Sequence, residues 1–472
     1  MIYFLIATVL GVLCIIFHPF TKQLSLEELP VNIASADAFD DKDPFAPAPI
    51  ESKEEDEKEN DNDEEAWACA KCGMVNHGKY CENCGAPGPF VPKEEEPKSV
   101  TFEPCPAFAL IDEEEQERKE TLAKRQAEAF QNPTLPEVTR FVVDYARDSR
   151  LHLSYTPEII ASFIAGLGAT KLTILQGMSG TGKTSLPKIF AEALDCDCRL
   201  VEVESSWKDK NELIGYYNEF TKLFTPKKFT TALYSATLEK ETINFIVLDE
   251  MNLSRIEYYF SDFLSLMEAE PDKRVFSLSS VPLFRQEDGT RKDYLGLTKG
   301  TTIRVTPNLW FIGTANRDES TFEISDKVYD RSNVINLNHR APKAIPQGQP
   351  RSPKYLSYAA LQGLFDTALS SFAFDLDTVP YLSKLEEILA PYNISFGNRI
   401  ARQIEAYVRI YCSCFIDKEA HLNEALESIL LDKVVHKLEY KSIEDKESLA
   451  EAFEAIGLKR CAAFVRSLSE DL

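Results

Sequence analysis

The hydrophobic residues of this chain follow two patterns along the sequence. Short runs in which nearly every residue is apolar, bounded by polar or turn residues, are typical of strands buried on both faces of a parallel sheet. Apolar residues at helical spacing precede the first run, over 138–145 and again over 159–167. The runs themselves lie at 172–175, 199–203, 243–248, 309–314 and 334–337. Together, these patterns predict an α/β domain built on a parallel sheet.

Shifts in composition divide the chain of 472 residues into six predicted segments. A chain of this length exceeds one ordinary domain. The segments are a membrane anchor over 1–20, an acidic disordered linker over 21–65, a zinc ribbon over 66–88, a charged linker and helix over 89–135, a nucleotide-binding domain over 136–342, and a helical lid with further C-terminal helices over 343–472.

The first 20 residues are strongly apolar, and no charged side chain precedes Lys22. A stretch of this length is just enough to span a bilayer. We therefore expect a retained single-span anchor, with a cleaved signal peptide or a buried helix as alternatives; no basic segment or small-residue cleavage site marks a signal peptide. The expected location is the bacterial inner membrane, with the larger part of the chain in the cytoplasm.

Acidic side chains concentrate near the N-terminus. Residues 1–120 hold 27 Asp and Glu against 10 Lys and Arg, so about −17 of the net charge of −24 lies there. The stretch 21–65 has too little apolar surface to offset the entropy of ordering, which predicts a disordered tether. A solvated spacer is the plain interpretation, and an acidic recognition motif is the alternative.

Two Cys-x2-Cys pairs follow the acidic stretch. Their spacing can place four thiolates around one zinc ion, and a glycine after each pair permits the tight turn near the metal. Such a site leaves no open coordination position, so it predicts a structural zinc ribbon rather than a catalytic centre. Acidic runs on both sides would repel phosphate, which favours protein docking and leaves nucleic-acid binding uncertain. The predicted zinc ligands are Cys69, Cys72, Cys81 and Cys84.

A glycine-rich loop lies between the first apolar run and a helix-like stretch. It matches the phosphate-binding pattern G-x4-G-K-[ST] in the setting that this motif requires. Its glycines let backbone N–H groups point at phosphates, Lys183 can reach the β- and γ-phosphates, and the Thr184 hydroxyl can bind magnesium. The predicted nucleotide-binding residues of the loop are Gly177, Ser179, Gly180, Thr181, Gly182, Lys183 and Thr184.

Polar residues at the ends of later runs can complete a hydrolytic site. The run 243–248 leads into Asp249 and Glu250, which would hold magnesium through water and polarise the attacking water, respectively. Asn316 follows the next run and would help to orient that water; a strand-ending residue in a turn is the alternative. Arg331 precedes the last run and would act as an arginine finger on a neighbouring subunit, unless it forms a plain salt bridge with a nearby aspartate.

These motifs resemble those of McrB-type AAA+ NTPases, within the dynein-related and MoxR-like group. The likeness rests on residues 207–218, 248–268 and 312–316, and it continues at 396–404, which resembles a sensor-2 helix. It implies hydrolysis of a nucleoside triphosphate with Mg²⁺, a helical lid, a hexameric ring of identical subunits and a separate protein partner. In the best-known member, that partner is a nuclease that cuts modified DNA.

The resemblance gives Arg399 the sensor-2 role of touching bound nucleotide, with Arg402 as the alternative. Two departures limit the likeness. No DNA-reading domain is recognisable near the N-terminus, and Glu319 and Ser320 stand where the best-known member has Asp and Arg. The guanine preference of that member is therefore not carried over, and ATP is the expected nucleotide, with GTP as the alternative.

Three functions are open at this point. The leading hypothesis is a membrane-tethered ATPase ring that remodels or translocates a partner or polymer. The alternatives are the motor of a DNA-restriction or anti-phage complex and a nucleotide-switched scaffold that recruits proteins through the zinc ribbon. Insertions are expected at 215–229 and 274–305, the first near the ring axis, with Tyr216 and Tyr217 as candidates for either substrate contact or ordinary packing.

Overall fold

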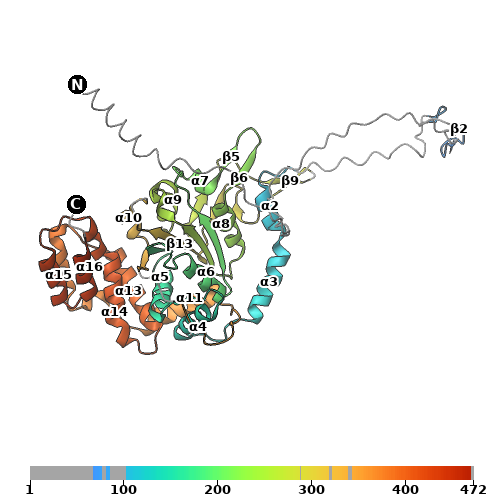
Figure 1. Cartoon of the computed structure of the whole chain (residues 1–472). Helices are drawn as coiled ribbons and strands as arrows, with labels where there is room; N and C mark the ends of the chain where they lie inside the picture. Colours follow the sequence, from blue (N-terminus) through green and yellow to red (C-terminus); the bar gives the residue numbers. More distant parts are fainter. Residues whose placement is uncertain are drawn as a thin grey trace, which may run out of the picture. The chain divides into compact units, whose positions relative to one another are not determined.

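A computed structural model describes residues 67–76, 81–84, 102–287, 289–317, 321–338 and 343–468 (Figure 1). The chain divides into two units, residues 1–93 and 94–472, and each is described by itself. The predicted anchor over 1–20 and the predicted acidic linker over 21–65 lie outside the described residues.

A five-stranded parallel sheet forms the centre of the larger unit, which confirms the predicted α/β fold (Figure 1). The strands lie in the order β14, β3, β13, β7, β4, and each neighbouring pair is parallel. Their bounds are Leu172–Gly177 (β3), Asp197–Glu202 (β4), Asn244–Asp249 (β7), Leu309–Asn316 (β13) and Asn333–Asn336 (β14).

Successive residues of the strands point to opposite faces of the sheet and enter two hydrophobic cores. In β7, Phe245 and Val247 join a core with α4, α5 and α6, whereas Ile246 and Leu248 join a core with α8 and α9. Because both faces are covered, the strands read as continuous apolar runs in the sequence. The helices are α4 (Leu135–Asp148), α5 (Pro157–Ala169), α6 (Ser185–Ala193), α7 (Asn211–Ile214), α8 (Lys228–Leu238), α9 (Ile256–Leu266) and α10 (Asp326–Tyr329).

The C-terminal part of the described chain is helical, as predicted, and it shares a core with the sheet. Ile404 and Val408 of α13 are buried in the same cluster as Ile160 and Ile164 of α5. The C-terminal helices, here called the lid after the prediction, are α11 (Tyr358–Ser371), α12 (Leu382–Leu389), α13 (Asn398–Ser413), α14 (Leu422–Lys433), α15 (Lys446–Ala455) and α16 (Lys459–Ser467). Short 3-10 turns are η2 (Met251–Leu253), η3 (Pro271–Lys273), η4 (Leu376–Thr378), η5 (Ala390–Tyr392), η6 (Glu419–His421) and η7 (Val435–Tyr440).

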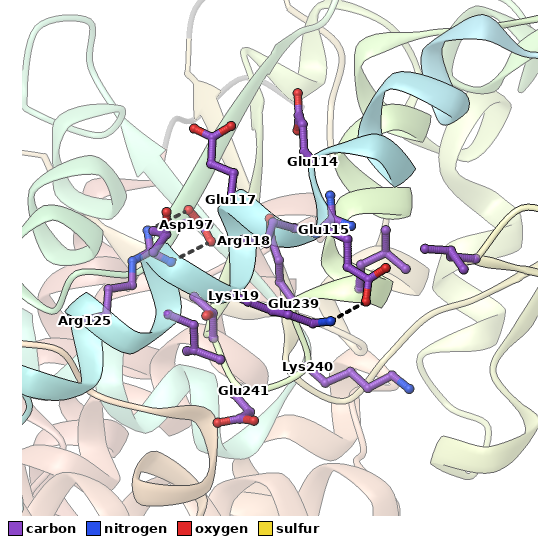
Figure 2. Close-up of a pocket in the computed structure, with 15 residues that line it drawn as sticks. Glu114, Glu115, Glu117, Arg118, Lys119, Arg125, Asp197, Glu239, Lys240 and Glu241 are labelled. Carbon is purple, nitrogen blue, oxygen red and sulfur yellow. Dashed lines mark hydrogen bonds and ion pairs between the residues drawn. The ribbon is translucent and has the colours of Figure 1, made fainter.

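The charged segment before the domain contains two helices, α2 (Pro106–Glu113) and α3 (Glu115–Ala127). The first is part of the core, because Phe108 is fully buried and stacks on Tyr234 with ring centroids 4.1 Å apart. The second has no buried residue. Instead, Arg125 of α3 donates two hydrogen bonds to Asp197 at the start of edge strand β4, at 3.1 and 3.2 Å (Figure 2). Ion pairing therefore attaches the charged helix to the edge of the sheet.

Both predicted insertions contain β-structure. The first is a hairpin of β5 (Gly215–Asn218) and β6 (Leu223–Pro226). Tyr216 in β5 is 55% exposed, and Phe220 in the connecting turn is 98% exposed. The second insertion contains a three-stranded sheet and a further hairpin, formed by β8 (Val275–Ser277), β11 (Leu297–Thr298) and β12 (Thr302–Arg304), and by β9 (Arg285–Glu287) and β10 (Thr290–Lys292).

Within the part of the chain that the structure describes, no helix is both long enough and apolar enough to cross a membrane. The longest, α13, has 16 residues and includes Arg399, Arg402 and Glu405, whereas a membrane span needs about 20 predominantly apolar residues. This finding contradicts the predicted single-pass location in the bacterial inner membrane, and we correct that prediction. The stretch 1–20, on which it rested, lies outside the described residues.

Candidate nucleotide site and metal centre

The candidate site lies at the carboxyl-terminal edge of the central strands. The register of the sheet places Asn316 at the end of β13 opposite Gly177 at the end of β3. On its other side, β13 pairs with β7, which ends at Asp249. Open parallel sheets bind ligands at this edge, outside the carboxyl ends of the strands. The fold thus brings residues from three separate stretches of sequence to one place.

The glycine-rich loop turns sharply between β3 and α6. Gly177 has a φ of +150°, and a Cβ atom there would lie 2.2 Å from the backbone oxygen of Leu337, so a side chain has no space. Inside the loop, Lys183 is only 7% exposed. Its ammonium group donates to the backbone oxygens of Gly177 and Met178, at 3.0 and 2.6 Å. The lysine is therefore fixed at the centre of the loop, with its charge close to backbone oxygens that a phosphate oxygen could replace.

A chain of hydrogen bonds joins the loop to the two neighbouring strands. The hydroxyls of Thr184 and Thr314 both donate to Oδ1 of Asp249, each at 2.7 Å. The Thr314 oxygen in turn accepts the backbone N–H of Glu250 at 2.8 Å. Thr184 and Asp249 thus present a hydroxyl and a carboxylate side by side, and Mg²⁺ prefers oxygen ligands of this kind. The predicted magnesium ligands are in contact with each other.

The Glu250 side chain is held by an unusual backbone conformation. Its φ of +53° lies in the left-handed region, which costs a non-glycine residue about 1–3 kcal/mol and tends to occur at functional sites. The Nδ2 group of Asn316 donates to Oε1 of Glu250 at 3.4 Å. Asn252, which is 3% exposed, donates to the backbone oxygen of Asn316 at 2.8 Å. The carboxylate and the amide therefore face each other beside the loop.

Two further residues position the site at this edge, and the sequence alone did not predict their roles. Thr314 links Asp249 to the Glu250 backbone, and Asn252 fixes the end of β13. Both lie in stretches that carry the family resemblance, but neither was given a role there. The only signal in the sequence was that each is a polar residue inside or beside an apolar run. The hydrogen-bond partners of such residues lie on neighbouring strands and become known only from the strand order of the fold.

The two predicted arginines lie together, away from the glycine-rich loop. Arg331 Nε lies 3.0 Å from Oε1 of Glu268, and Arg399 pairs with the same oxygen. Arg399 also lies 3.5 Å from Asp330. The family resemblance predicted that Arg399 touches nucleotide, but within one subunit Arg399 lies beside Arg331 and not beside the loop residues. Arg402, the alternative, is exposed.

A cavity of about 320 Å³ lies between β14 and the C-terminal helices, and no residue of the glycine-rich loop lines it. It is lined from the sheet side by Asn336, whose strand pairs with the end of β3, and from the lid by Asp432 and Arg460. Burial raises the pKa of Asp432 to about 7, although Arg460 and a hydrogen bond from Asn336 oppose this shift. The cavity is therefore lined by both acidic and basic side chains, but it is not part of the phosphate-binding candidate.

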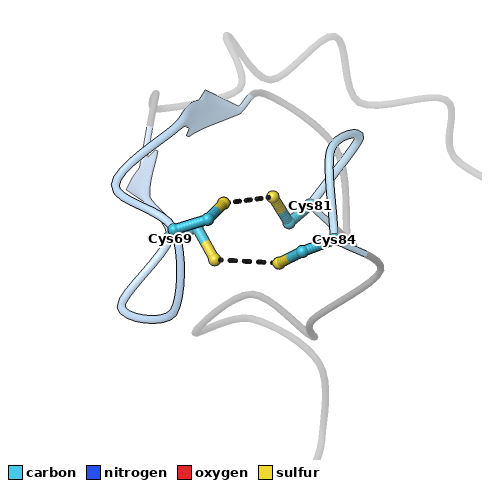
Figure 3. Close-up of side chains that lie close together, drawn as sticks. Cys69, Cys81 and Cys84 are labelled. Atoms are coloured by element: carbon cyan, nitrogen blue, oxygen red, sulfur yellow. Dashed lines mark hydrogen bonds between the residues drawn. The ribbon is translucent and has the colours of Figure 1, made fainter.

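The smaller unit holds the four cysteines of the predicted zinc ribbon close together (Figure 3). Their sulfur atoms lie within 4.8 Å of one another, and the pairs Cys69–Cys84 and Cys72–Cys81 are 3.6 and 3.4 Å apart. A tetrahedral ion with Zn–S bonds of about 2.3 Å needs sulfur atoms about 3.8 Å apart. The four thiols therefore fit a tetrahedral metal site with four cysteine ligands.

Backbone contacts around the cysteines fix this arrangement. Strands β1 (Trp67–Ala68) and β2 (Val75–Asn76) pair on either side of the first Cys-x2-Cys turn. Gly73 has a φ of +72° and donates its N–H to the Cys69 oxygen at 2.7 Å. The buried Asn76 side chain accepts the N–H of Glu82 at 3.0 Å and so connects the two cysteine pairs. Asn76 therefore positions metal-ligand candidates that lie apart in sequence.

Comparisons with known proteins add little to this geometry. No protein-family model and no curated protein matches the chain. A solved structure from Cytophaga hutchinsonii, described as a "putative ATPase", is similar at 14% identity over 73% of this chain and 97% of that one, with a TM-score of 0.44. A likeness this low supports no conclusion about activity, and the fold described above rests on the strand order and register of this chain.

Proposed function

We propose that this protein is a nucleoside triphosphatase of the AAA+ class that hydrolyses ATP with Mg²⁺. The observation that carries the proposal is the hydrogen-bonded chain from Thr184 through Asp249 and Thr314 to Glu250. This chain joins the end of the glycine-rich loop to the ends of two parallel strands. As a result, Lys183, the metal-ligand pair Thr184 and Asp249, and the carboxylate–amide pair Glu250 and Asn316 lie at one edge of the sheet.

Each of these groups has a distinct part in phosphoryl transfer, which depends on positioning and charge stabilisation. Lys183 neutralises the β- and γ-phosphates. Thr184 and Asp249 hold Mg²⁺, which offsets the charge that develops on the phosphate oxygens. Glu250 polarises the attacking water, and Asn316 keeps the Glu250 carboxylate and that water in line.

Substitutions that separate nucleotide binding from hydrolysis test this proposal. Lys183→Ala should abolish binding of a fluorescent ATP analogue and hydrolysis together. Glu250→Gln should keep binding and lower the turnover rate by at least about 100-fold, because water activation of this kind contributes roughly 10²–10⁴ in rate. Lys188→Ala, an exposed lysine of the helix after the loop, is the matched control and should behave like the wild type. Undiminished turnover in Lys183→Ala would refute the proposal, and competition by GTP would establish the nucleotide preference.

We further infer that the active form is a ring of identical subunits, six by resemblance. Arg331 lies two residues before the first residue of β14 and therefore near the start of the sheet, whereas the glycine-rich loop follows the end of β3. Strand β3 has six residues and, at about 3.3 Å per residue, spans about 16–20 Å between these two edges of the sheet. Arg331 therefore cannot reach the glycine-rich loop of its own subunit. Light scattering of Glu250→Gln with ATP should show a large closed assembly; a monomer under these conditions would refute the ring.

The ring would remodel or translocate a protein partner or a polymer, with a nuclease-like effector as one candidate partner. Support comes from the β5–β6 hairpin, whose turn presents the fully exposed Phe220 to solvent. The four-cysteine unit would bind Zn²⁺ and dock a protein. Recovery of proteins bound to the ATP-loaded Glu250→Gln variant, compared with a Phe220→Ala double variant, tests this part; equal recovery with both would exclude Phe220 as a contact.

A further inference from the structure

The first described residues of the larger unit lie between its two insertions (Figure 1). Phe102 exchanges two backbone hydrogen bonds with Gln286 of β9, each 3.0 Å long. Two residues later, the backbone oxygen of Pro104 accepts the N–H of Phe224 in β6 at 2.7 Å. Residues 102–108, here called the strap, therefore join the β5–β6 hairpin to the β9–β10 hairpin through backbone hydrogen bonds.

A carboxylate fixes the start of the strap by charge. Glu103 pairs with the guanidinium group of Arg285 and accepts a hydrogen bond from the Tyr294 hydroxyl. The Tyr294 oxygen in turn accepts the backbone N–H of Cys105 at 2.8 Å. The side chains of Glu103 and Arg285 are only 19% and 13% exposed, and shielding from water strengthens the attraction between opposite charges. Glu103 therefore holds the strap against the second insertion.

The other end of the strap is anchored in the core. Phe108 in α2 is fully buried and stacks on Tyr234. Its ring centroid also lies 6.1 Å from that of Phe224 in β6 and 5.8 Å from that of Tyr294. Phe102, at the start of the strap, is 37% exposed. The strap thus has a fixed end in α2 and a superficial end at Phe102, so its first residues can leave while α2 stays in place.

The hairpin that the strap holds is tied together up to its turn. The Oδ1 atom of Asn218, the last residue of β5, accepts the N–H groups of Phe220 and Thr221 at 2.9 and 3.2 Å. The backbone oxygen of Asn218 accepts the N–H of Lys222 at 2.8 Å. These bonds connect the turn to the paired strands β5 and β6. The exposed Phe220 in the turn therefore follows a displacement of Phe224, the strap's partner in β6.

We propose that the strap sets the position of the β5–β6 hairpin, and that a protein docked on the chain directly before Phe102 displaces residues 102–104 and frees the hairpin. The four-cysteine unit, proposed above to dock a protein, lies on this side of the strap in the sequence. The inference goes beyond the nucleotide hydrolysis proposed above and does not rest on it. It gives a protein bound ahead of the strap a direct route to Phe220 at the tip of the hairpin.

Release of residues 102–104 is a local opening of the structure. It breaks the backbone hydrogen bonds of these residues and the ion pair of Glu103 with Arg285. Backbone groups freed at the surface bond to water, so each lost hydrogen bond changes stability only modestly. Arg285 keeps a second partner, Glu113, at 2.8 Å, and Phe108 stays buried in the core. Openings confined to a few superficial residues belong to the low end of the range of local stabilities within one protein.

Removal of the Glu103 carboxylate tests whether the strap holds the hairpin. In the full chain, Glu103→Ala should speed amide hydrogen exchange across residues 215–226 by at least about threefold, the effect of losing about one hydrogen bond. Glu113→Ala is the matched control, because Glu113 pairs with the same arginine but is the last residue of α2; it should leave this exchange unchanged. Exchange across strand β7 and thermal melting check folding, and the milder Glu103→Gln should show a smaller change in the same direction.

A second experiment tests release by docking. A streptavidin-binding peptide inserted between residues 100 and 101 brings streptavidin directly before the strap, whereas the same peptide between residues 62 and 63 keeps it far away in the sequence. Addition of streptavidin should speed exchange across residues 215–226 in the first protein and leave it unchanged in the second. No change in either protein would overturn release by docking. An equal rise in both would overturn it as well, because contact next to the strap would then not be required.

Neither experiment uses ATP, so failure of the strap and failure of the proposed hydrolysis are distinguishable. If Lys183→Ala hydrolyses ATP normally, the proposed function fails and the strap is untouched. If Glu103→Ala and Glu113→Ala give equal exchange across the hairpin, whether raised or not, the strap does not position the hairpin and this inference is overturned. Faster exchange in Glu103→Ala alone, together with release by streptavidin bound directly before the strap, supports it.

Discussion

Replacement of Thr314 by valine should damage both the stability and the proposed hydrolytic site, although the two side chains have nearly the same shape. Thr314 is 1% exposed. Its hydroxyl donates to Asp249 at 2.7 Å and accepts the Glu250 backbone N–H at 2.8 Å. Valine removes both bonds. The backbone N–H of Glu250 then lacks its acceptor, and the Asp249 carboxylate loses one of its hydroxyl donors.

The magnitude follows from the two lost bonds. A hydrogen bond to a charged group contributes about 1.5–3 kcal/mol, and a buried donor left without a partner costs about 1–3 kcal/mol. Because Asp249 keeps the bond from Thr184 and water can reach the edge of the site, we expect a total loss of about 2–4 kcal/mol in the free energy of unfolding. Misplacement of Glu250 should lower the turnover rate about 10- to 100-fold and change the KM for ATP little, because the phosphate contacts remain.

The matched control is Thr173→Val in the adjacent strand β3. Thr173 is equally buried, but its hydroxyl has no hydrogen-bond partner in the described part of the chain. Removal of a buried unpaired hydroxyl should be neutral or stabilising by about 1 kcal/mol. Urea unfolding and ATP turnover of both variants are the measurements. Equal losses in the two variants would refute the reasoning, because the effect would then come from the threonine-to-valine change itself rather than from the bonds of Thr314.

Three further predictions concern other parts of the chain. Purified wild-type protein should contain about one equivalent of zinc by metal analysis, and wild-type protein without zinc would contradict this prediction. Cys81→Ser should lose the zinc but keep the thermal melting transition of the larger unit. Gly177→Ala should abolish nucleotide binding or folding because its Cβ would lie 2.2 Å from a backbone oxygen, whereas Gly363→Ala, where a Cβ has open space, should be tolerated in the same binding assay. Burial, with help from the charge of Lys437, lowers the pKa of His436 to about 3. The folded state therefore keeps the ring neutral, whereas the unfolded state protonates it below a pKa of about 6.5. The free energy of unfolding should fall by up to about 1.4 kcal/mol per pH unit as the pH drops from about 6.5 towards 3. His436→Leu should flatten that acid dependence in urea titrations between pH 6 and 4, and an unchanged slope would show that the ring is not kept neutral by burial.

The central strands and the glycine-rich loop were predictable because their signals are local. A strand covered on both faces must be apolar throughout, and a loop that turns around phosphates must contain glycine at fixed spacing. The burial of α2 was not predictable in the same way. Its apolar run, 106–111, is short and is followed by acidic residues, so it looks like part of a charged linker. The burial of Phe108 depends on the ring of Tyr234, which lies 126 positions later in the chain.

The grouping of the arginines shows the same limit. The sequence indicated Arg331 by its position before the last apolar run and Arg399 by the family resemblance, and it gave the two residues separate roles. Their convergence on Glu268 depends on the packing of α13 beside the start of the sheet, which no motif encodes. Charge alone suggested a partner for Arg331 among the adjacent aspartates, but the structure supplies the partner from the end of a different helix. Pairings between distant segments therefore decide what the individual residues can do.

One turn of the lid contacts residues next to both candidate phosphate-handling groups. In η7, Lys437 donates to Asp330 at 2.8 Å, next to Arg331, and Glu439 lies 3.5 Å from Arg317, next to Asn316. Asn316 pairs with Glu250 at the loop edge, whereas Arg331 lies at the opposite edge of the sheet. A shift of the lid on nucleotide binding would therefore act on Asp330 and Arg317 together, since both ion pairs belong to one short rigid turn. Through this turn, a change at the loop edge of the sheet can be transmitted to Arg331 at the opposite edge, and contiguous contacts of this kind can carry coupling between distant sites.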